Sequence, residues 1–162
     1  MTVRVAVLTI SDAGARGERA DTSGDAIVAW ISSHGFALVE RRLVPDETAA
    51  IVRVLVEWAD RAGVDLVLTT GGTGLTPRDV TPEATRAVLD REAPGIAEAI
   101  RAEALLRFPR AALSRGLAGV RGATLIVNLP GSPGGVNDGL TVLTRWVHHA
   151  VELVRGVHTD HA

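Results

Sequence analysis

The stretch DLVLTTGGTGLTPRDVTPE, residues 65–83, places a strand, a glycine loop and a helix start in direct succession. Residues 65–70 form an apolar run typical of a buried strand. Three glycines within residues 71–74 allow the backbone to bend tightly and to approach a ligand closely. The triplet Thr81-Pro-Glu predicts a helix with threonine at the N-cap, proline at the first helical position and an acid in the first turn.

The same alternation extends over the rest of the chain. Further strands are expected at residues 3–10, 36–44, 117–120 and 123–128, and a polar loop at residues 11–22. Apolar spacing and start signals predict helices at residues 27–34, 45–62, 81–91, 94–107 and 140–154. This alternation predicts a three-layer α/β/α sandwich with a mostly parallel sheet. The short strand at residues 117–120 is expected to be antiparallel.

Composition restricts the chemistry that the chain can perform. Its 162 residues and 17.0 kDa suit one domain, expected at residues 1–156 with a flexible tail at 157–162. All 17 Lys/Arg positions are arginine, and Cys and Tyr are absent, which excludes a lysine Schiff base, a P-loop lysine, a thiolate nucleophile and a disulfide framework. A net charge of −2 and 3% aromatic residues argue against nucleic acid. We expect a cytoplasmic protein without a membrane span.

Ligands of parallel sheets bind beyond the carboxyl ends of the strands. The loops expected at that rim are Ser11-Asp12, residues 45–47, residues 71–79 and residues 128–135. In the third of these, Gly71, Gly72 and Gly74 expose N–H groups that suit phosphate oxygens, and Thr73 and Thr76 add hydroxyls. The alternative is a plain strand-to-helix turn. A dinucleotide fingerprint is disfavoured, because Pro77 stands where a third glycine belongs.

Two aspartates on separate rim loops are candidate ligands of one hard cation. Asp79 is not needed as a helix cap if Thr81 is the N-cap, so we interpret it as a magnesium ligand or an electrostatic organiser; the alternative is a solvated pair with Arg78. Asp46 shares the rim, and its alternative is an ordinary N-cap.

The remaining candidates each have a structural alternative. Ser11 and Asp12 suit a polar ligand or a local turn. Ser114 and Arg115 suit an anion or a surface loop. A rigid loop with a few polar donors is expected from Asn128, Pro130, Gly131 and Ser132. The histidines contribute little, and a metal site at His158 and His161 is disfavoured.

Residues 69–85 resemble the signature of the Mog/MoaB-type family of molybdenum-cofactor biosynthesis, the molybdopterin adenylyltransferases. Shorter segments resemble the family at matching intervals: Thr9-Ile-Ser-Asp, Val44-Pro-Asp-Glu, Leu113-Ser-Arg-Gly and Asn128-Leu-Pro-Gly-Ser-Pro. The resemblance covers nearly the whole chain. It implies an α/β/α sandwich that assembles as a homotrimer.

The resemblance also implies an activity, the Mg²⁺-dependent conversion of ATP and molybdopterin to adenylyl-molybdopterin and pyrophosphate. It places Asp46 and Asp79 at the functionally important aspartates and residues 71–74 at the Gly-Gly-Thr-Gly loop. The molybdenum-insertion enzyme is the partner it suggests. Two alternatives stay open: a non-catalytic molybdopterin-binding scaffold of the same fold, and a nicotinamide-dependent oxidoreductase, which the defective fingerprint disfavours.

Overall fold

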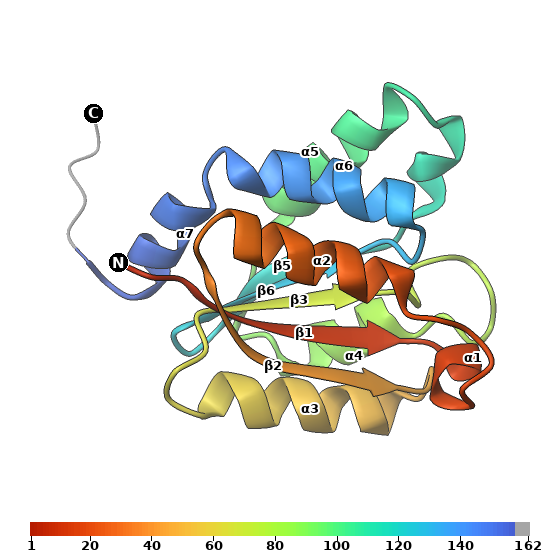
Figure 1. The fold of residues 1–162 in the computed structure, drawn as a ribbon, viewed down its shortest axis with the longest axis horizontal. Coiled ribbons are helices and arrows are strands. Elements are labelled where there is room, and N and C mark those ends of the chain that lie inside the picture. Colours follow the sequence, from red (N-terminus) through yellow and green to blue (C-terminus); the bar gives the residue numbers. More distant parts are fainter. Residues whose placement is uncertain (158–162) are drawn as a thin grey trace.

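A computed structural model describes residues 1–157 and contains one six-stranded sheet (Figure 1). The strand order is β2-β1-β3-β6-β5-β4. The strands are β1 (Arg4–Ile10), β2 (Ala37–Val44), β3 (Leu66–Thr70), β4 (Arg91–Glu92), β5 (Ala118–Arg121) and β6 (Thr124–Leu129). β1 is parallel to β2 and β3, and β3 is parallel to β6, whereas β5 is antiparallel to β6 and β4. The predicted mostly parallel sheet is confirmed, as is the antiparallel strand near residues 117–120.

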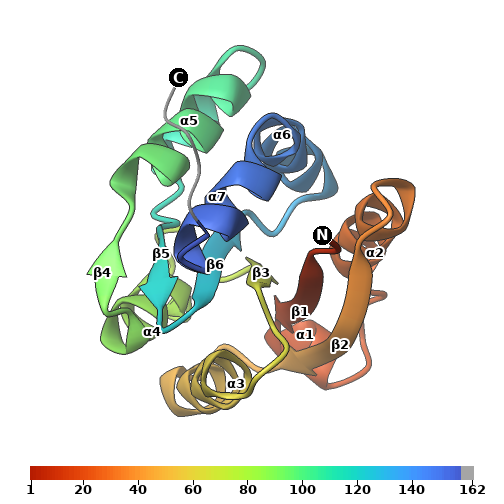
Figure 2. The ribbon, with the colours of Figure 1, turned by 90° about the vertical axis from the view of Figure 1, so that its left-hand side faces the viewer.

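Helices cover both faces of this sheet (Figures 1 and 2). One face carries α2 (Thr22–Ser33), α5 (Pro94–Leu105), α6 (Pro133–Thr144) and α7 (Val147–Val154). The other face carries α3 (Thr48–Asp60) and α4 (Thr81–Val88). A one-turn helix, α1 (Asp12–Ala15), and a 3-10 helix, η1 (Pro109–Leu113), lie in the connections. The predicted three-layer sandwich is confirmed.

Alternate residues of the central strands supply the two halves of the core. In β1, Val5 and Val7 pack into the cluster under α2 and α6, whereas Ala6 and Leu8 pack under α3. A parallel strand covered on both faces is apolar throughout, which is why residues 3–10 read as a continuous apolar run. No helix within residues 1–157 combines the length and apolarity that a membrane crossing requires.

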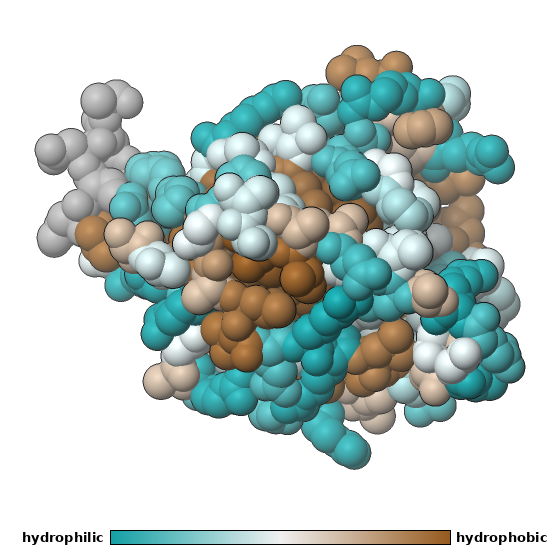
Figure 3. All heavy atoms as spheres, viewed as in Figure 1, coloured by the Kyte–Doolittle hydropathy of each residue, from teal (hydrophilic) through white to brown (hydrophobic). Residues whose placement is uncertain are grey.

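The edge strand β2 is less covered than its neighbours. Leu38 and Val39 are exposed, and Figure 3 shows hydrophobic surface within this face of the molecule. Charged side chains follow at Glu40, Arg41 and Arg42. Charged residues on an edge strand oppose unwanted pairing with other strands. The exposed edge of β2 is therefore apolar near its start and charged in its middle.

Several predicted boundaries were wrong. The N-cap of α4 is Val80, because the Thr81 hydroxyl donates to the carbonyl oxygen of Gly71 (2.9 Å) instead of capping the helix. That helix ends at Val88, since residues 91–92 pair with β5.

Two further segments differ from the expectation. The loop expected at residues 11–22 includes α1 and the start of α2, and the last helix is divided where Trp146 leaves helical geometry (φ −151°). The tail predicted at residues 157–162 and the two tail histidines lie outside the described residues, apart from Val157.

At the end of the sheet opposite the rim loops, one buried aspartate pairs with two arginines. Asp65 is 2% exposed, and its carboxylate accepts from Arg4 Nε (2.9 Å) and Arg155 Nε (2.8 Å). Although burial opposes ionisation, the hydrogen bonds from both arginines hold the pKa of Asp65 well below its usual range. The stability that this group provides is therefore present above the ordinary Asp range and is lost as pH falls toward the lowered pKa.

Asp65→Ala is expected to lower the free energy of unfolding by about 1.5–3 kcal/mol, because it removes the charged hydrogen bonds that Arg4 and Arg155 donate to a buried carboxylate. Urea unfolding measures this. Asp25→Ala is the control: its carboxylate is 68% exposed beside Arg41, so the loss should stay below about 1 kcal/mol. Equal losses in the two variants would show that the Asp65 pair does not stabilise the fold.

Candidate functional site

The loops at the carboxyl ends of the parallel strands enclose two adjoining hollows, named here hollow A and hollow B. Hollow A has a volume of about 540 Å³ and lies at the ends of β1 and β3. Hollow B, about 570 Å³, lies between the glycine loop, α5 and η1. Both volumes fall within the range of small-molecule sites. Four residues line both hollows: Gly72, Asp79, Gly131 and Ser132.

The glycine loop requires glycine at its first two positions. Gly71 has φ +99° and Gly72 has φ +68°, a region that L side chains rarely adopt. A Cβ at Gly71 would lie 2.2 Å from the carbonyl oxygen of Ile10, and one at Gly72 would lie 2.3 Å from the Thr81 hydroxyl. These glycines are therefore required by close packing against β1 and α4, and their close approach to a ligand stays a prediction.

Arg115 fastens the loop at its other end. Its backbone N–H donates to Thr73 O, its Nε to Gly74 O and its Nη2 to Asp79 O, each at 2.8 Å, and its guanidinium also pairs with Glu83. The neighbouring Ser114 lines hollow B. Arg115 lines neither hollow, so its described contacts make it a support of the loop, and anion binding by Arg115 stays a prediction.

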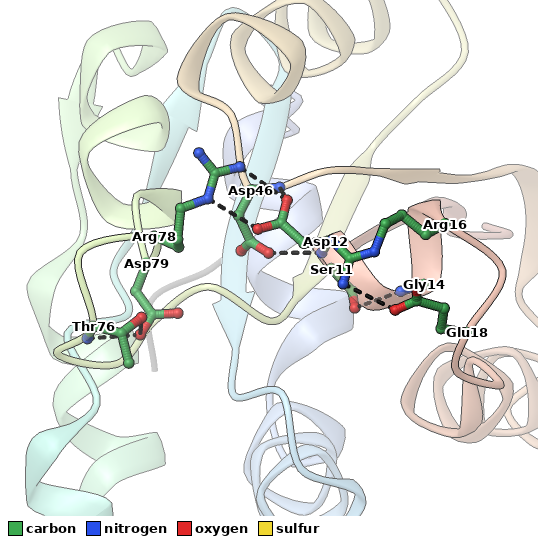
Figure 4. A network of polar contacts seen from close by, with 9 residues as sticks. All are labelled: Ser11, Asp12, Gly14, Arg16, Glu18, Asp46, Thr76, Arg78 and Asp79. Carbon is green, nitrogen blue, oxygen red and sulfur yellow. Dashed lines mark hydrogen bonds and ion pairs between the residues drawn. The ribbon is translucent and has the colours of Figure 1, made fainter.

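A clasp of Asp12, Asp46 and Arg78 joins three rim loops (Figure 4). The backbone N–H of Asp12 donates to Asp46 Oδ2 (2.8 Å), and that of Asp46 donates to Asp12 Oδ1 (3.0 Å). Arg78 then donates from Nε and Nη2 to the two Asp12 oxygens, at 2.9 and 3.0 Å. The Arg78 hydrogen bonds, followed by the one from the Asp46 backbone, lower the pKa of Asp12 to about 2. Arg78 is thus paired with Asp12, and the alternative of an Arg78–Asp79 pair was wrong.

Asp46 is held in a setting that disfavours its charge. Burial raises its pKa above the ordinary Asp value, and the charges of Asp12 and Asp79 raise it further. Its other oxygen, Oδ1, receives no hydrogen bond from the described residues. Glu47, not Asp46, occupies the N-cap position of α3. The simple capping role considered for Asp46 was therefore wrong.

Asp79 lies at the junction of the two hollows and is fixed by its own turn. Its Oδ2 accepts from the backbone N–H of Thr76 (3.0 Å) and from the Thr76 hydroxyl (2.7 Å). Figure 4 shows Asp79 beside Thr76, apart from the Asp12 and Asp46 carboxylates of the clasp. No described hydrogen bond reaches Oδ1 of Asp79, so each of these two aspartates offers one unpaired oxygen.

The carboxylate pair fits Mg²⁺, which binds oxygen ligands and usually keeps water or substrate phosphate in most positions. Asp46 carries a charge that burial and its neighbours destabilise, and a cation would relieve both effects. Residues 1–157 hold no cluster of three or more metal-ligating side chains. A metal bound to Asp46 and Asp79 would therefore draw its remaining ligands from water and substrate.

Other predicted residues have structural roles at the rim. Ser11 caps α1 by accepting from the backbone N–H of Gly14 (3.0 Å), and Ser132 caps α6 by accepting from that of Gly135 (3.1 Å). Both also line hollow A. Asn128 lines neither hollow; it is 4% exposed, and its amide donates to Thr69 and Thr85 (3.0 Å each). These hydrogen bonds join β6 to β3 and α4, and a ligand contact by Asn128 stays a prediction.

Sequence reasoning missed the wall of hollow A around Asp21. The Asp21 carboxylate caps α2 by accepting from Gly24 N (2.9 Å), and it also accepts from Thr9 Oγ1 (2.7 Å) and Arg41 (2.9 Å). Ser23 donates to the carbonyl oxygen of Gly131 (2.7 Å) and so connects this wall to the loop after β6. The order Asp-x-x-Gly before an apolar run is a cap signal that could have located this wall.

Asp46→Asn should stabilise the fold by roughly 0.5–2 kcal/mol, the usual size of a single stabilising substitution. A raised pKa means that the folded state binds the Asp46 proton more tightly than the unfolded state does, so the ionised carboxylate costs stability at neutral pH. That cost disappears as pH falls through the raised pKa.

Urea unfolding between about pH 7 and about pH 4 measures this effect, and the advantage of Asp46→Asn should shrink toward the lower pH. Asp60→Asn is the control, because its exposed carboxylate accepts from Arg121 and its loss should not stabilise. A less stable Asp46→Asn protein at neutral pH would contradict the conclusion that the ionised Asp46 carboxylate destabilises the fold.

Comparison with known proteins finds one family over most of the chain. Residues 6–149 match the family described as "Probable molybdopterin binding domain". The Escherichia coli K12 molybdopterin adenylyltransferase is 44% identical over 142 residues, which cover 86% of this chain and 72% of that protein. The Drosophila melanogaster molybdenum cofactor synthesis protein cinnamon is 43% identical, and this chain spans 26% of its length.

Solved structures share the fold. The Thermus thermophilus molybdopterin biosynthesis enzyme MoaB is 55% identical, with a TM-score of 0.90 over 96% of this chain and 98% of that one. The Pyrococcus furiosus tungsten cofactor synthesizing protein MoaB is 36% identical, with a TM-score of 0.86 over 95% and 98%.

Proposed function

The chain belongs to the family of probable molybdopterin binding domains, and we propose from this premise that it is a molybdopterin adenylyltransferase whose reaction takes place where hollows A and B meet. ATP and molybdopterin are its substrates. The observation that carries the proposal is the shared boundary of the hollows, where Asp79 and Gly72 line both and Asp46 lines hollow A. Two ligands in adjoining hollows would meet at these side chains.

The reaction needs no nucleophile from the protein. An oxygen of the molybdopterin phosphate attacks the α-phosphorus of ATP and forms a new P–O bond. The bond from the α-phosphorus to the oxygen that bridges to the β-phosphate breaks, and pyrophosphate leaves with that electron pair. Catalysis then consists of alignment and charge stabilisation, which agrees with a chain that contains no Lys, Cys or Tyr.

The rim residues supply alignment through the backbone. Residues 72–74 would direct N–H groups at anionic oxygens, whereas the N–H of Gly71 donates to the carbonyl oxygen of Leu129 (3.3 Å). Thr81 and Arg115 hold this loop from its two ends. The clasp of Asp12, Asp46 and Arg78 fixes the Asp46 carboxylate, which lines hollow A beside Gly72. Substrate binding by the remaining predicted residues, among them Thr73, Thr76, Ser114, Pro130, Gly131 and Ser132, is part of the proposal.

We propose Asp46 and Asp79 as the residues that would hold Mg²⁺. When bound, the ion would neutralise phosphate charge. The carboxylates themselves would orient the ion, and the Thr76 hydrogen bonds keep Asp79 in one position.

Incubation with molybdopterin and Mg-ATP, with the products read by mass, tests the function. The expected products are adenylyl-molybdopterin and pyrophosphate, and both should be absent when molybdopterin is omitted or EDTA is added. Binding of molybdopterin without release of pyrophosphate would instead identify a non-catalytic scaffold.

We also propose a single domain over residues 1–156, a homotrimer, a cytoplasmic location and contact with a molybdenum-insertion enzyme. The exposed Leu38 and Val39 on edge strand β2 support self-association. Light scattering of the purified chain tests the assembly, with three times 17.0 kDa expected and a single-chain mass contradicting it.

A further inference from the structure

The chain contains arginine but no lysine, and most of its arginines form ion pairs with Asp or Glu carboxylates. Within residues 1–157, the arginines without a carboxylate partner are Arg19, Arg53, Arg91, Arg101 and Arg110. The guanidiniums nearest the carboxylates of the site are engaged. Arg78 pairs with Asp12, and Arg41 pairs with Asp21. These arginines are therefore not the cations available to a ligand.

Arginines without a carboxylate partner occur on the walls of both hollows. Arg19 lines hollow A, and Arg101 and Arg110 line hollow B. Arg101 is occupied in another way, since its Nη1 donates to the carbonyl oxygens of Gly116 (2.7 Å) and Ser114 (3.3 Å). Arg19 and Arg110 make no side-chain hydrogen bond with the described residues. Among those residues, each hollow thus contains one arginine that is free to bind an incoming group.

The chemistry of the site requires such cations. Asp46 and Asp79 line the hollows and repel phosphate groups at short range. A metal at these carboxylates would act at the junction, whereas phosphate oxygens that face either hollow would need a separate partner. A guanidinium presents paired N–H groups that match two oxygens of one phosphate, and the pair is stronger than a neutral hydrogen bond.

We propose that Arg19 and Arg110 are substrate-binding residues that bind phosphate groups, one in each hollow, and that each therefore holds a different substrate of the adenylyl transfer. The inference rests on the proposed function and extends it to two residues outside the motifs of the sequence. The shared chemistry is a phosphate ester or polyphosphate, which comes from ATP in one hollow and from molybdopterin in the other.

Steady-state kinetics of Arg19→Gln and Arg110→Gln, with each substrate varied in turn, tests the proposal. Each variant should raise the KM of one substrate by roughly tenfold or more, as expected for a lost charged hydrogen bond, and should change kcat by less than about threefold. The two variants should affect different substrates. Arg110→Lys should recover part of the affinity, because the charge remains while the paired geometry is lost.

Arg53→Gln and Arg91→Gln are the matched controls, because these arginines are exposed, lack carboxylate partners within residues 1–157 and line neither hollow. Wild-type KM values for both substrates in Arg19→Gln and Arg110→Gln, or a rise for the same substrate in both, would overturn the proposal.

The affinities of the chain for ATP and for molybdopterin, measured separately by calorimetry, distinguish failure of the arginine proposal from failure of the proposed function. If the wild-type chain binds both ligands but transfers nothing, the proposed activity fails, and each arginine variant should still weaken one ligand by roughly tenfold. If turnover is normal and neither variant weakens binding, the arginine proposal alone fails.

Discussion

Asp79→Asn is expected to lower kcat of adenylyl transfer by roughly 100-fold or more, the usual effect of removing one group that stabilises transition-state charge. The side chain is nearly isosteric, and an Asn oxygen can still accept the two hydrogen bonds from Thr76. The turn at residues 76–79 should therefore persist. What disappears is the negative charge at the boundary that hollows A and B share.

Pyrophosphate release at saturating Mg-ATP and molybdopterin measures this effect. Asp60→Asn is the control, since Asp60 is an exposed aspartate paired with Arg121 that lines neither hollow. It should retain nearly full kcat. If Asp79→Asn turns over at the wild-type rate, Asp79 is a turn-forming residue and the catalytic assignment is wrong.

Gly71→Ala is expected to lower the free energy of unfolding by about 2–5 kcal/mol, through strained backbone and forced overlap together. The φ of +99° is unfavourable for alanine, and the new Cβ would lie 2.2 Å from the carbonyl oxygen of Ile10. That carbonyl belongs to the last residue of strand β1, so moving it would disturb the backbone of the sheet. Activity should be lost as well, because the glycine loop would move away from hollow A.

Gly35→Ala separates the two causes. Gly35 also has a positive φ (+67°), but a Cβ there meets nothing within 4 Å. Its loss should be about 1–2 kcal/mol, the cost of the left-handed backbone alone. Equal urea midpoints for the two variants would contradict a close approach of Gly71 to β1.

The parallel fold could be predicted because its signals are local. The apolar run at residues 3–10, the strand-and-loop order at residues 65–74 and the helix spacing around Trp58 each depend on neighbours in sequence. The loops at the rim could be predicted from these strands, because the carboxyl ends of parallel strands lie at one edge of the sheet. Ile10 indeed faces Val44 across β1 and β2, which brings the next residues of both loops together.

What could not be predicted depends on partners distant in sequence. Asp12 and Asp46 are 34 positions apart and exchange backbone hydrogen bonds only because two loops meet. The local sequence predicts Thr81 as a helix cap, yet its hydroxyl donates to the carbonyl oxygen of Gly71. Asn128 reads as a loop donor, yet it is buried against Thr69 and Thr85. In each case a tertiary hydrogen bond replaces the one that local sequence suggests.

The stereochemical course at the α-phosphorus tests the central claim most directly. ATP made chiral at that centre by sulfur substitution is converted with molybdopterin, and the configuration of the product is determined. Direct attack by the molybdopterin phosphate, aligned by the glycine loop and the two aspartates, predicts inversion. Retention would show two successive displacements through an adenylylated side chain of the protein, and it would contradict a site that works by alignment and charge alone.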